Sequence, residues 1–132
     1  MYFDNKTLEN ITAPQEVIVS VMEQNGLECH GAWDYDRMTF DKRFDLKEGR
    51  YYLRVFCIAT SGDVGNKSAV LKILKPAIGK YYYPHGVEYD ENEEVFPKHL
   101  VKECEQILAN AKKRFAALGF TVEEASKKTV KA

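Results

Sequence analysis

The sequence has no long apolar run and no excess of either charge. Its 132 residues include 19 Lys and Arg against 20 Asp and Glu, a formal net charge of -1. Without a basic excess, no global field draws the chain to nucleic acid or to an anionic membrane. The N-terminus, Met1-Tyr2-Phe3-Asp4, lacks the basic and apolar blocks of a signal peptide. We therefore expect a cytoplasmic protein with no nucleic-acid and no membrane partner.

Cysteine is scarce, and its spacing argues against two common uses. Cys29, Cys57 and Cys104 are the only three cysteines, and no two of them form a CxxC pair. An odd, widely spaced set is not typical of a disulfide framework or of a structural zinc site. Cys29 and His30 are neighbours, so in an extended segment their side chains point to opposite faces. The sequence therefore predicts reduced thiols, no bound metal and no cofactor.

The apolar residues that are present predict two amphipathic helices. One lies between Pro14, which is well placed in a first helical turn, and Asn25-Gly26, which tolerate the left-handed conformation that ends helices. The other begins near Pro97, carries an apolar stripe to about Leu118, and ends at Gly119. Residues 1–12 form a weaker extended segment that Leu8 and Ile11 could anchor.

Runs of strand-forming residues fill the region between the helices. Residues 50–60 make the strongest strand, and residues 68–74 return beside it after a hairpin loop. The order β-α-β-β-β-β-α predicts an α+β fold, with an antiparallel sheet of about five strands and two helices packed on one face. Residues 1–119 are expected to form a single domain, and residues 120–132 a frayed polar tail.

One face of the predicted sheet is not explained by the core. Side chains alternate along a strand, so one face, the core face, is apolar and meets the helices; its members in the strongest strand are Tyr51, Leu53, Val55, Cys57 and Ala59. The opposite face, the second face, mixes aromatic, apolar and cationic side chains: Tyr52, Arg54, Phe56, Ile58, Val70, Lys72 and Leu74. A wet antiparallel face normally shows cleaner alternation, so this one needs an explanation.

Three readings of the second face stay open. Other segments of the same chain could cover it, a second copy could cover it in a homodimer, or it could form a groove for a small molecule or peptide. For the last two readings we predict ligand or interface residues at Tyr52, Arg54, Phe56, Ile58, Tyr81 and Tyr83.

Residues 81–89 are the densest cluster of groups that could carry chemistry. His85 and Glu88, among several tyrosines, could form a general acid/base pair in which the carboxylate orients the imidazole. No nucleophile with an activating partner accompanies them. Tyrosines that pack with their hydroxyls at a rim explain the segment more simply. His85 and Glu88 are therefore the candidates of an enzyme alternative.

Acidic and basic residues alternate over residues 34–45. Asp34, Asp36, Asp41 and Asp45 lack the ligand spacing of a calcium loop. Cross-strand ion pairs on a solvated face explain these residues better than a cation site does.

Three segments in order carry a resemblance to a known family: GAWDYDR at 31–37, YYLRV at 51–55 and GKYYYPHGVEY at 79–89. Together they resemble the YugN-like family of small proteins from spore-forming Gram-positive bacteria, nearly throughout the chain up to the second helix. The resemblance implies a compact α+β fold with two helices on a curved sheet, in the arrangement of TATA-binding-protein-like folds. It implies no activity, so no catalytic or binding residues carry over.

The sequence leaves function open and favours one class over another. We expect a non-enzymatic cytoplasmic binding or interaction protein that uses the second face, with a homodimer as one form. The alternative is a small enzyme with acid/base chemistry at His85 and Glu88.

Overall fold

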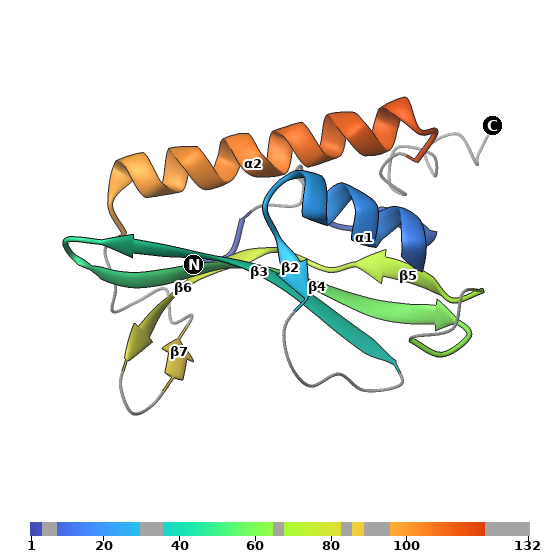
Figure 1. Ribbon diagram of the computed structural model, residues 1–132, viewed down its shortest axis with the longest axis horizontal. Coiled ribbons are helices and arrows are strands. Elements are labelled where there is room, and N and C mark those ends of the chain that lie inside the picture. Colours follow the sequence, from blue (N-terminus) through green and yellow to red (C-terminus); the bar gives the residue numbers. More distant parts are fainter. Residues whose placement is uncertain (4–7, 30–35, 65–67, 83–85, 89–95, 121–132) are drawn as a thin grey trace, which may run out of the picture.

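The computed structural model describes residues 1–3, 8–29, 36–64, 68–82, 86–88 and 96–120. It confirms the predicted α+β class: two helices lie on one face of an antiparallel sheet (Figure 1). In chain order the elements are β1 (Thr12–Pro14), α1 (Gln15–Gln24), β2 (Glu28–Cys29), β3 (Arg37–Leu46), β4 (Gly49–Ser61), β5 (Val70–Ile73), β6 (Ala77–Tyr82), β7 (Gly86–Glu88) and α2 (Lys98–Ala117).

Strand β4 organises the sheet. One edge of β4 pairs with β3 along nearly its whole length. The other edge is shared, because β6 lies opposite residues 51–54 and β5 lies opposite residues 57–61. β1 extends the sheet beyond β5, β2 beyond β3, and β7 beyond β6. Within the described residues the sheet has seven strands where the sequence predicts about five, since elements as short as β2 and β7 show no periodicity.

Both helices end as the sequence predicts, whereas Pro14, predicted in the first helical turn, is the last residue of β1, and α1 begins at Gln15. Pro14 precedes α1, and Asn25 ends it with a side-chain hydrogen bond from Nδ2 to the Val21 carbonyl oxygen at 2.8 Å. Gly26 follows with a φ of 84°, a left-handed conformation that glycine adopts without a steric penalty. α2 spans 20 residues after Pro97. Its buried side chains recur at intervals of three and four residues, as an amphipathic helix requires: Leu100, Cys104, Leu108, Ala111 and Phe115.

Burial along β4 follows the predicted alternation. On the core face Leu53 and Val55 are 0% exposed, and Tyr51 is 1% exposed. Tyr51 packs against Phe96, which precedes α2, and their ring centroids lie 5.8 Å apart. The residues between them are only half-buried: Tyr52, Arg54, Phe56 and Ile58. The core therefore lies between the sheet and the two helices.

The N-terminal residues run along an edge of the sheet. The Met1 ammonium donates a hydrogen bond to the Ile78 carbonyl at 3.0 Å, and the Phe3 amide donates one to the Pro76 carbonyl at 2.9 Å. Leu8 and Ile11 are fully buried, which confirms them as anchors of this segment. At the other end Phe120 packs against the core. Most of the predicted tail, residues 121–132, lies outside the described residues, and the TATA-binding-protein-like arrangement is not confirmed.

Candidate functional site: the second face of the sheet

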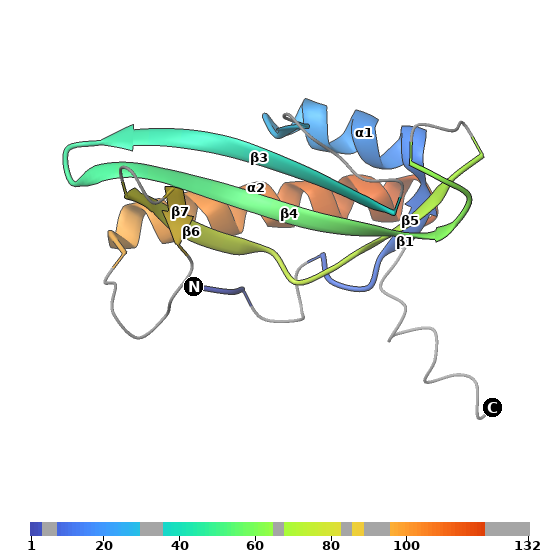
Figure 2. The ribbon, with the colours of Figure 1, turned by 90° about the horizontal axis from the view of Figure 1, so that it is seen from below.

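The strand register gathers the second face from several strands, with β3, β4 and β5 at its centre. Cross-strand partners share a face, so the pairs Asp41–Arg54, Thr39–Phe56 and Ile58–Lys72 fix its members. Figure 2 looks onto this side of the sheet, with the long helix α2 behind the strands. Residues on this face include Glu28, Arg37, Thr39, Asp41, Arg43, Asp45, Arg50, Tyr52, Arg54, Phe56, Ile58, Val70 and Lys72.

Four of the predicted site residues form one continuous row on β4: Tyr52, Arg54, Phe56 and Ile58. Tyr81 of β6 joins them at one end, because the Arg50 guanidinium carbon lies 5.9 Å from the centre of its ring. Tyr83 and His85 lie outside the described residues. For Glu88 only the backbone, in β7, is described. The structure therefore brings together five of the six predicted interface residues, and the sixth, Tyr83, and the predicted acid/base pair stay predictions.

A half-buried ion pair sits in the middle of the row. Arg54 donates two hydrogen bonds to Oδ2 of Asp41, from Nη2 at 2.8 Å and from Nε at 3.2 Å. The Asp41 side chain is only 9% exposed and that of Arg54 26%. A carboxylate this deeply buried is stable only with a charged, hydrogen-bonding partner. The guanidinium of Arg54 also lies over the Tyr52 ring, 5.7 Å from its centroid. The ion pair with Asp41 therefore fixes the position of Arg54, and Arg54 in turn packs on Tyr52.

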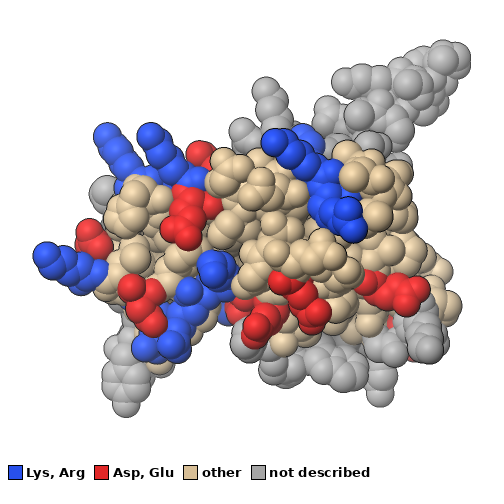
Figure 3. Space-filling view, turned by 45° about the horizontal axis from the view of Figure 1, so that its top comes forward, with Lys and Arg blue, Asp and Glu red and all other residues tan. Residues whose placement is uncertain are grey.

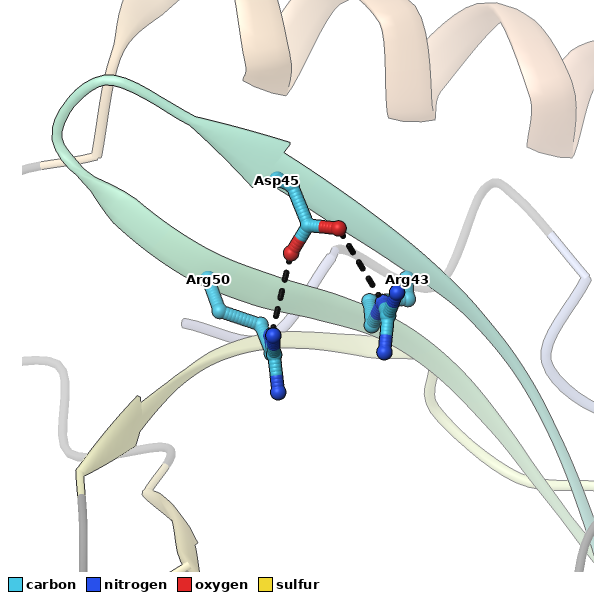
Figure 4. A network of polar contacts seen from close by, with 3 residues as sticks. All are labelled: Arg43, Asp45 and Arg50. Atoms are coloured by element: carbon cyan, nitrogen blue, oxygen red, sulfur yellow. Dashed lines mark hydrogen bonds and ion pairs between the residues drawn. The ribbon is translucent and has the colours of Figure 1, made fainter.

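A second, exposed ion-pair network lies toward the β3–β4 turn (Figure 4). Asp45 binds two arginines, with Oδ2 at 3.2 Å from Nε of Arg43 and Oδ1 at 3.0 Å from Nε of Arg50. All three side chains are more than 40% exposed. The hydrogen bond from Arg50 to Asp45 raises the pKa of Arg50. Both networks contain cross-strand ion pairs, as the sequence predicts for this acidic and basic region, but Asp41 is buried where a solvated face was expected.

Charge is unevenly distributed over the molecule. Among the described strand residues the second face carries five cations, Arg37, Arg43, Arg50, Arg54 and Lys72, and three anions, Glu28, Asp41 and Asp45. The face is therefore net cationic, whereas the chain has a net charge of -1. The side that the helices cover mixes both signs (Figure 3). Sequence composition could not reveal this, because the register of the strands decides which charges share a surface.

The structure adds a pocket that the sequence did not predict. It has a volume of about 380 Å³ and lies beside Phe56, at the border of the second face. Its other lining residues are Tyr2, Glu9, Leu74 and Lys75. Four separate chain segments contribute these five residues, so no local sequence signal announces the pocket.

The three cysteines are free, as predicted. Burial raises the pKa of Cys57, which is on the core face, and raises that of Cys104 on α2 to about 12. Burial also raises the pKa of the half-buried Cys29. These thiols are protonated at neutral pH and are poor nucleophiles and poor metal ligands. Among the described residues no group of three or more His, Cys, Asp or Glu side chains could hold a metal ion.

The fold and the site define a class: a small α+β protein with both helices on one face of an antiparallel sheet. Neither helix in the described part of the chain is long and apolar enough to cross a bilayer. A family model described as the YugN-like family matches residues 5–120, so the chain belongs to the YugN-like family, as the resemblance predicted.

Two relatives and one solved structure support this assignment. Uncharacterized protein YlbA of Bacillus subtilis (strain 168) is 44% identical over 106 residues, which cover 80% of this chain and 88% of YlbA. Uncharacterized protein YugN of the same organism is 32% identical over 56 residues, 42% of each chain. The crystal structure of the uncharacterized conserved protein YugN from Geobacillus kaustophilus HTA426 matches with a TM-score of 0.77 at 38% identity, covering 89% of this chain and 97% of that one.

Proposed function

We propose that this protein is a non-enzymatic, cytoplasmic binding protein and that the second face of its sheet is the binding surface. One observation carries the proposal: Tyr52, Phe56 and Ile58 form a half-buried aromatic and apolar row on the side of the sheet away from both helices. Such side chains lose contact with water when a partner covers them, and that burial stabilises the complex.

The partner that we propose for the whole face is a second copy of the chain. In a two-fold dimer each copy contributes the same surface, so the apolar row of one copy packs on the row of the other. The ion pairs of Arg54 with Asp41 and of Asp45 with two arginines neutralise part of the charge within each copy. The remaining cationic excess repels between copies, and this repulsion falls as salt screens it.

Sedimentation equilibrium of the purified protein tests the proposal. We expect a monomer–dimer equilibrium with Kd on the order of 10 μM, which tightens as salt is raised from 50 mM to 500 mM. Ile58→Glu places a carboxylate in the centre of the row and should weaken the dimer at least tenfold. The matched control is Leu118→Glu, which adds the same charge at an apolar residue 43% exposed at the end of α2.

Two results would contradict the dimer. One is a monomer at high micromolar concentration in high salt. The other is equal weakening by Ile58→Glu and Leu118→Glu. Thermal unfolding of each variant, followed by circular dichroism, shows whether a loss of dimer reflects a loss of fold.

The enzyme alternative has less support. It requires the imidazole of His85 close to a carboxylate, and His85 lies outside the described residues. The buried thiols Cys57 and Cys104 are not available as nucleophiles, since burial keeps them protonated.

A further inference from the structure

The outer edge of β3, defined here as residues 43–46, has no neighbouring strand in the described part of the chain. The inner edge of β3 pairs with β4 along its whole length, whereas β2 covers the outer side only opposite Phe40 and Asp41. Figure 2 shows the half of β3 next to the β3–β4 turn as the margin of the sheet, with α1 and β2 beside the other half. A short stretch of sheet edge is therefore uncovered beside the turn.

The turn decides which backbone groups of this edge are unpaired. Leu46 and Gly49 are partners with only two residues between them, so they exchange both backbone hydrogen bonds, as in other hairpins of this length. Bonded and non-bonded pairs alternate along an antiparallel ladder, so Phe44 bonds to β4, while Arg43 and Asp45 point their N–H and C=O groups away from it. Among the described residues no backbone hydrogen bond satisfies these outward groups. Such an edge can take up another strand.

The side chains on this edge are charged and alternate in sign. Arg43 and Asp45 lie on the second face, with side chains 53% and 54% exposed. Natural sheet edges are often blocked by charged side chains, above all lysine, because like charges keep a second edge away. Here a cation and an anion lie two residues apart, so an antiparallel strand with the same pattern can satisfy both charges.

Backbone geometry leaves three registers in which two copies of this edge could pair around a two-fold axis. Each register is centred on one residue, which lies opposite itself in the second copy. Centring on Arg43 or on Asp45 sets like charges directly opposite each other, which is destabilising. Centring on Phe44 places Arg43 of each copy opposite Asp45 of the other, and these are also the residues whose outward N–H and C=O groups can bond. The two Phe44 side chains then form a non-bonded cross-strand pair, in which aromatic rings pack closely.

We propose that the outer edge of β3 pairs with the same edge of a second copy, in the antiparallel register centred on Phe44. The two sheets become continuous, and the helices of both copies stay on the same side. Asp45 already binds Arg50 within its own copy, so the contact with Arg43 of the other copy extends an existing network. The contact is short, so we expect Kd on the order of 100 μM. It goes beyond the proposed function, because it uses an edge of the sheet and leaves the second face uncovered.

Hydrogen exchange of backbone amides, followed by two-dimensional NMR, measures this contact directly. The Arg43 and Asp45 amides have no partner on β4 and should exchange fast in the monomer. Raising the protein from about 20 μM to about 1 mM should slow their exchange about fourfold, because the dimer fraction rises with concentration. The Phe44 amide is the internal control, since β4 bonds it in both states, and its exchange should change by less than about a factor of two.

A charge exchange between copies tests the register. Arg43→Asp sets carboxylates opposite each other and Asp45→Arg sets guanidinium groups opposite each other, so each variant alone should raise Kd at least tenfold. In an equimolar mixture each variant meets opposite charges in the other, so Kd should return to within about threefold of the parent value. Lys113→Asp, which reverses an exposed cation of α2, is the control and should leave Kd unchanged. Sedimentation equilibrium measures all four samples.

Ile58→Glu serves as the parent in these experiments, because it weakens contacts through the second face and leaves the edge intact. Association through the edge should weaken as salt is raised, since opposite charges face each other, whereas the dimer through the second face should tighten.

Three outcomes would overturn the edge contact. One is exchange at Arg43 and Asp45 that does not depend on protein concentration. Another is loss of that dependence in Ile58→Glu, which would assign the protection to the second face. The third is a mixture of the two charge variants that associates no better than either alone. Association that Ile58→Glu leaves unchanged and that each charge variant abolishes would instead refute the face dimer and leave the edge contact standing, so the two proposals fail separately.

Discussion

Tyr51 and Tyr52 are neighbours in β4 and have opposite environments. Tyr51 is 1% exposed and packs beside Phe96 under α2, whereas Tyr52 is half-buried on the second face beside Arg54. The same contrast runs along the strand, with Leu53 and Val55 on the core face and Phe56 and Ile58 on the other. Residue type does not separate the two faces, since both are rich in aromatic and aliphatic side chains. What separates them is that the helices cover only one.

The cations of the two faces also differ. On the core face Lys42 and Lys80 extend over rings, with Nζ 5.4 Å from the centroid of Phe44 and 5.8 Å from that of Tyr51. A long lysine stem can pass along apolar surface and bring its ammonium group to water at the margin. On the second face the cations beside rings are arginines, and both Arg50 and Arg54 also bind an aspartate. Arginine suits that role because its planar guanidinium can stack and form ion pairs at once.

The largest expected effect is the loss of stability when a packed side chain is truncated on each face. Leu53→Ala removes a fully buried side chain and should lower the free energy of unfolding by about 3.5 kcal/mol. Ile58→Ala removes a similar volume from the half-buried face and should lower it by only about 1 kcal/mol. Urea unfolding at neutral pH measures both. Similar losses would mean that the second face is buried as deeply as the core face.

A second difference should appear at alkaline pH. An unfolded thiol ionises near the ordinary pKa of 9.0, whereas burial keeps Cys57 protonated in the folded state and raises the pKa of Cys104 to about 12. The thiols leave the free energy of unfolding unchanged well below pH 9, and they lower it as the pH rises from 9 toward the folded pKa values, because only the unfolded thiols ionise in that range. From pH 8 to pH 10 the two thiols together should lower the free energy of unfolding by about 3 kcal/mol.

Urea unfolding of the wild type and of the Cys57→Ala/Cys104→Ala variant, both under reducing conditions, isolates that effect. The variant starts less stable because it lacks two buried sulfurs, so the quantity to compare is the change between the two pH values. If the wild type and the variant lose equal stability between pH 8 and pH 10, the thiols are not the titrating groups.

The smallest expected effect is the difference in stability between variants of two aspartates on the second face. Asp41→Asn removes the negative charge that the half-buried Arg54 binds at Oδ2 and should lower the free energy of unfolding by about 2 kcal/mol. Asp45→Asn disrupts the exposed network and should cause a change too small to resolve, because solvent screens its ion pairs. Urea unfolding at low and high salt measures both. A large, salt-sensitive loss in Asp45→Asn would show that the exposed network matters more than its burial indicates.

Local patterns predicted the regular parts of this fold. The period of two in residues 51–58 assigned the faces of β4 correctly, because a strand places alternate side chains on opposite sides whatever it packs against. The apolar stripe of α2 and the Asn25-Gly26 stop were equally clear, since each depends on residues within a few positions of one another. The core-face residues and the row on the second face could therefore both be predicted from the sequence.

The pocket beside Phe56 could not be predicted from local patterns in the sequence. The hydrogen bond between Met1 and Ile78 joins residues 77 positions apart, and this pairing brings Tyr2 to the sheet edge. The break between β5 and β6 could be suspected from Pro76, but the residues that would line it could not. Nothing in the neighbourhood of Glu9 indicates that its carboxylate lies near Leu74.

The sequence alone determined the fold class, the two helices, the faces of the central strand and the membership of the YugN-like family. The sequence was sufficient because these features depend on periodicity and on motifs formed by residues that are close together in the chain. Only the tertiary structure decided which charges share the second face, which aspartate is buried, and where Tyr2, Glu9, Phe56 and Leu74 meet. These depend on strand register and on contacts between distant segments, and both arise from the packing of the whole chain.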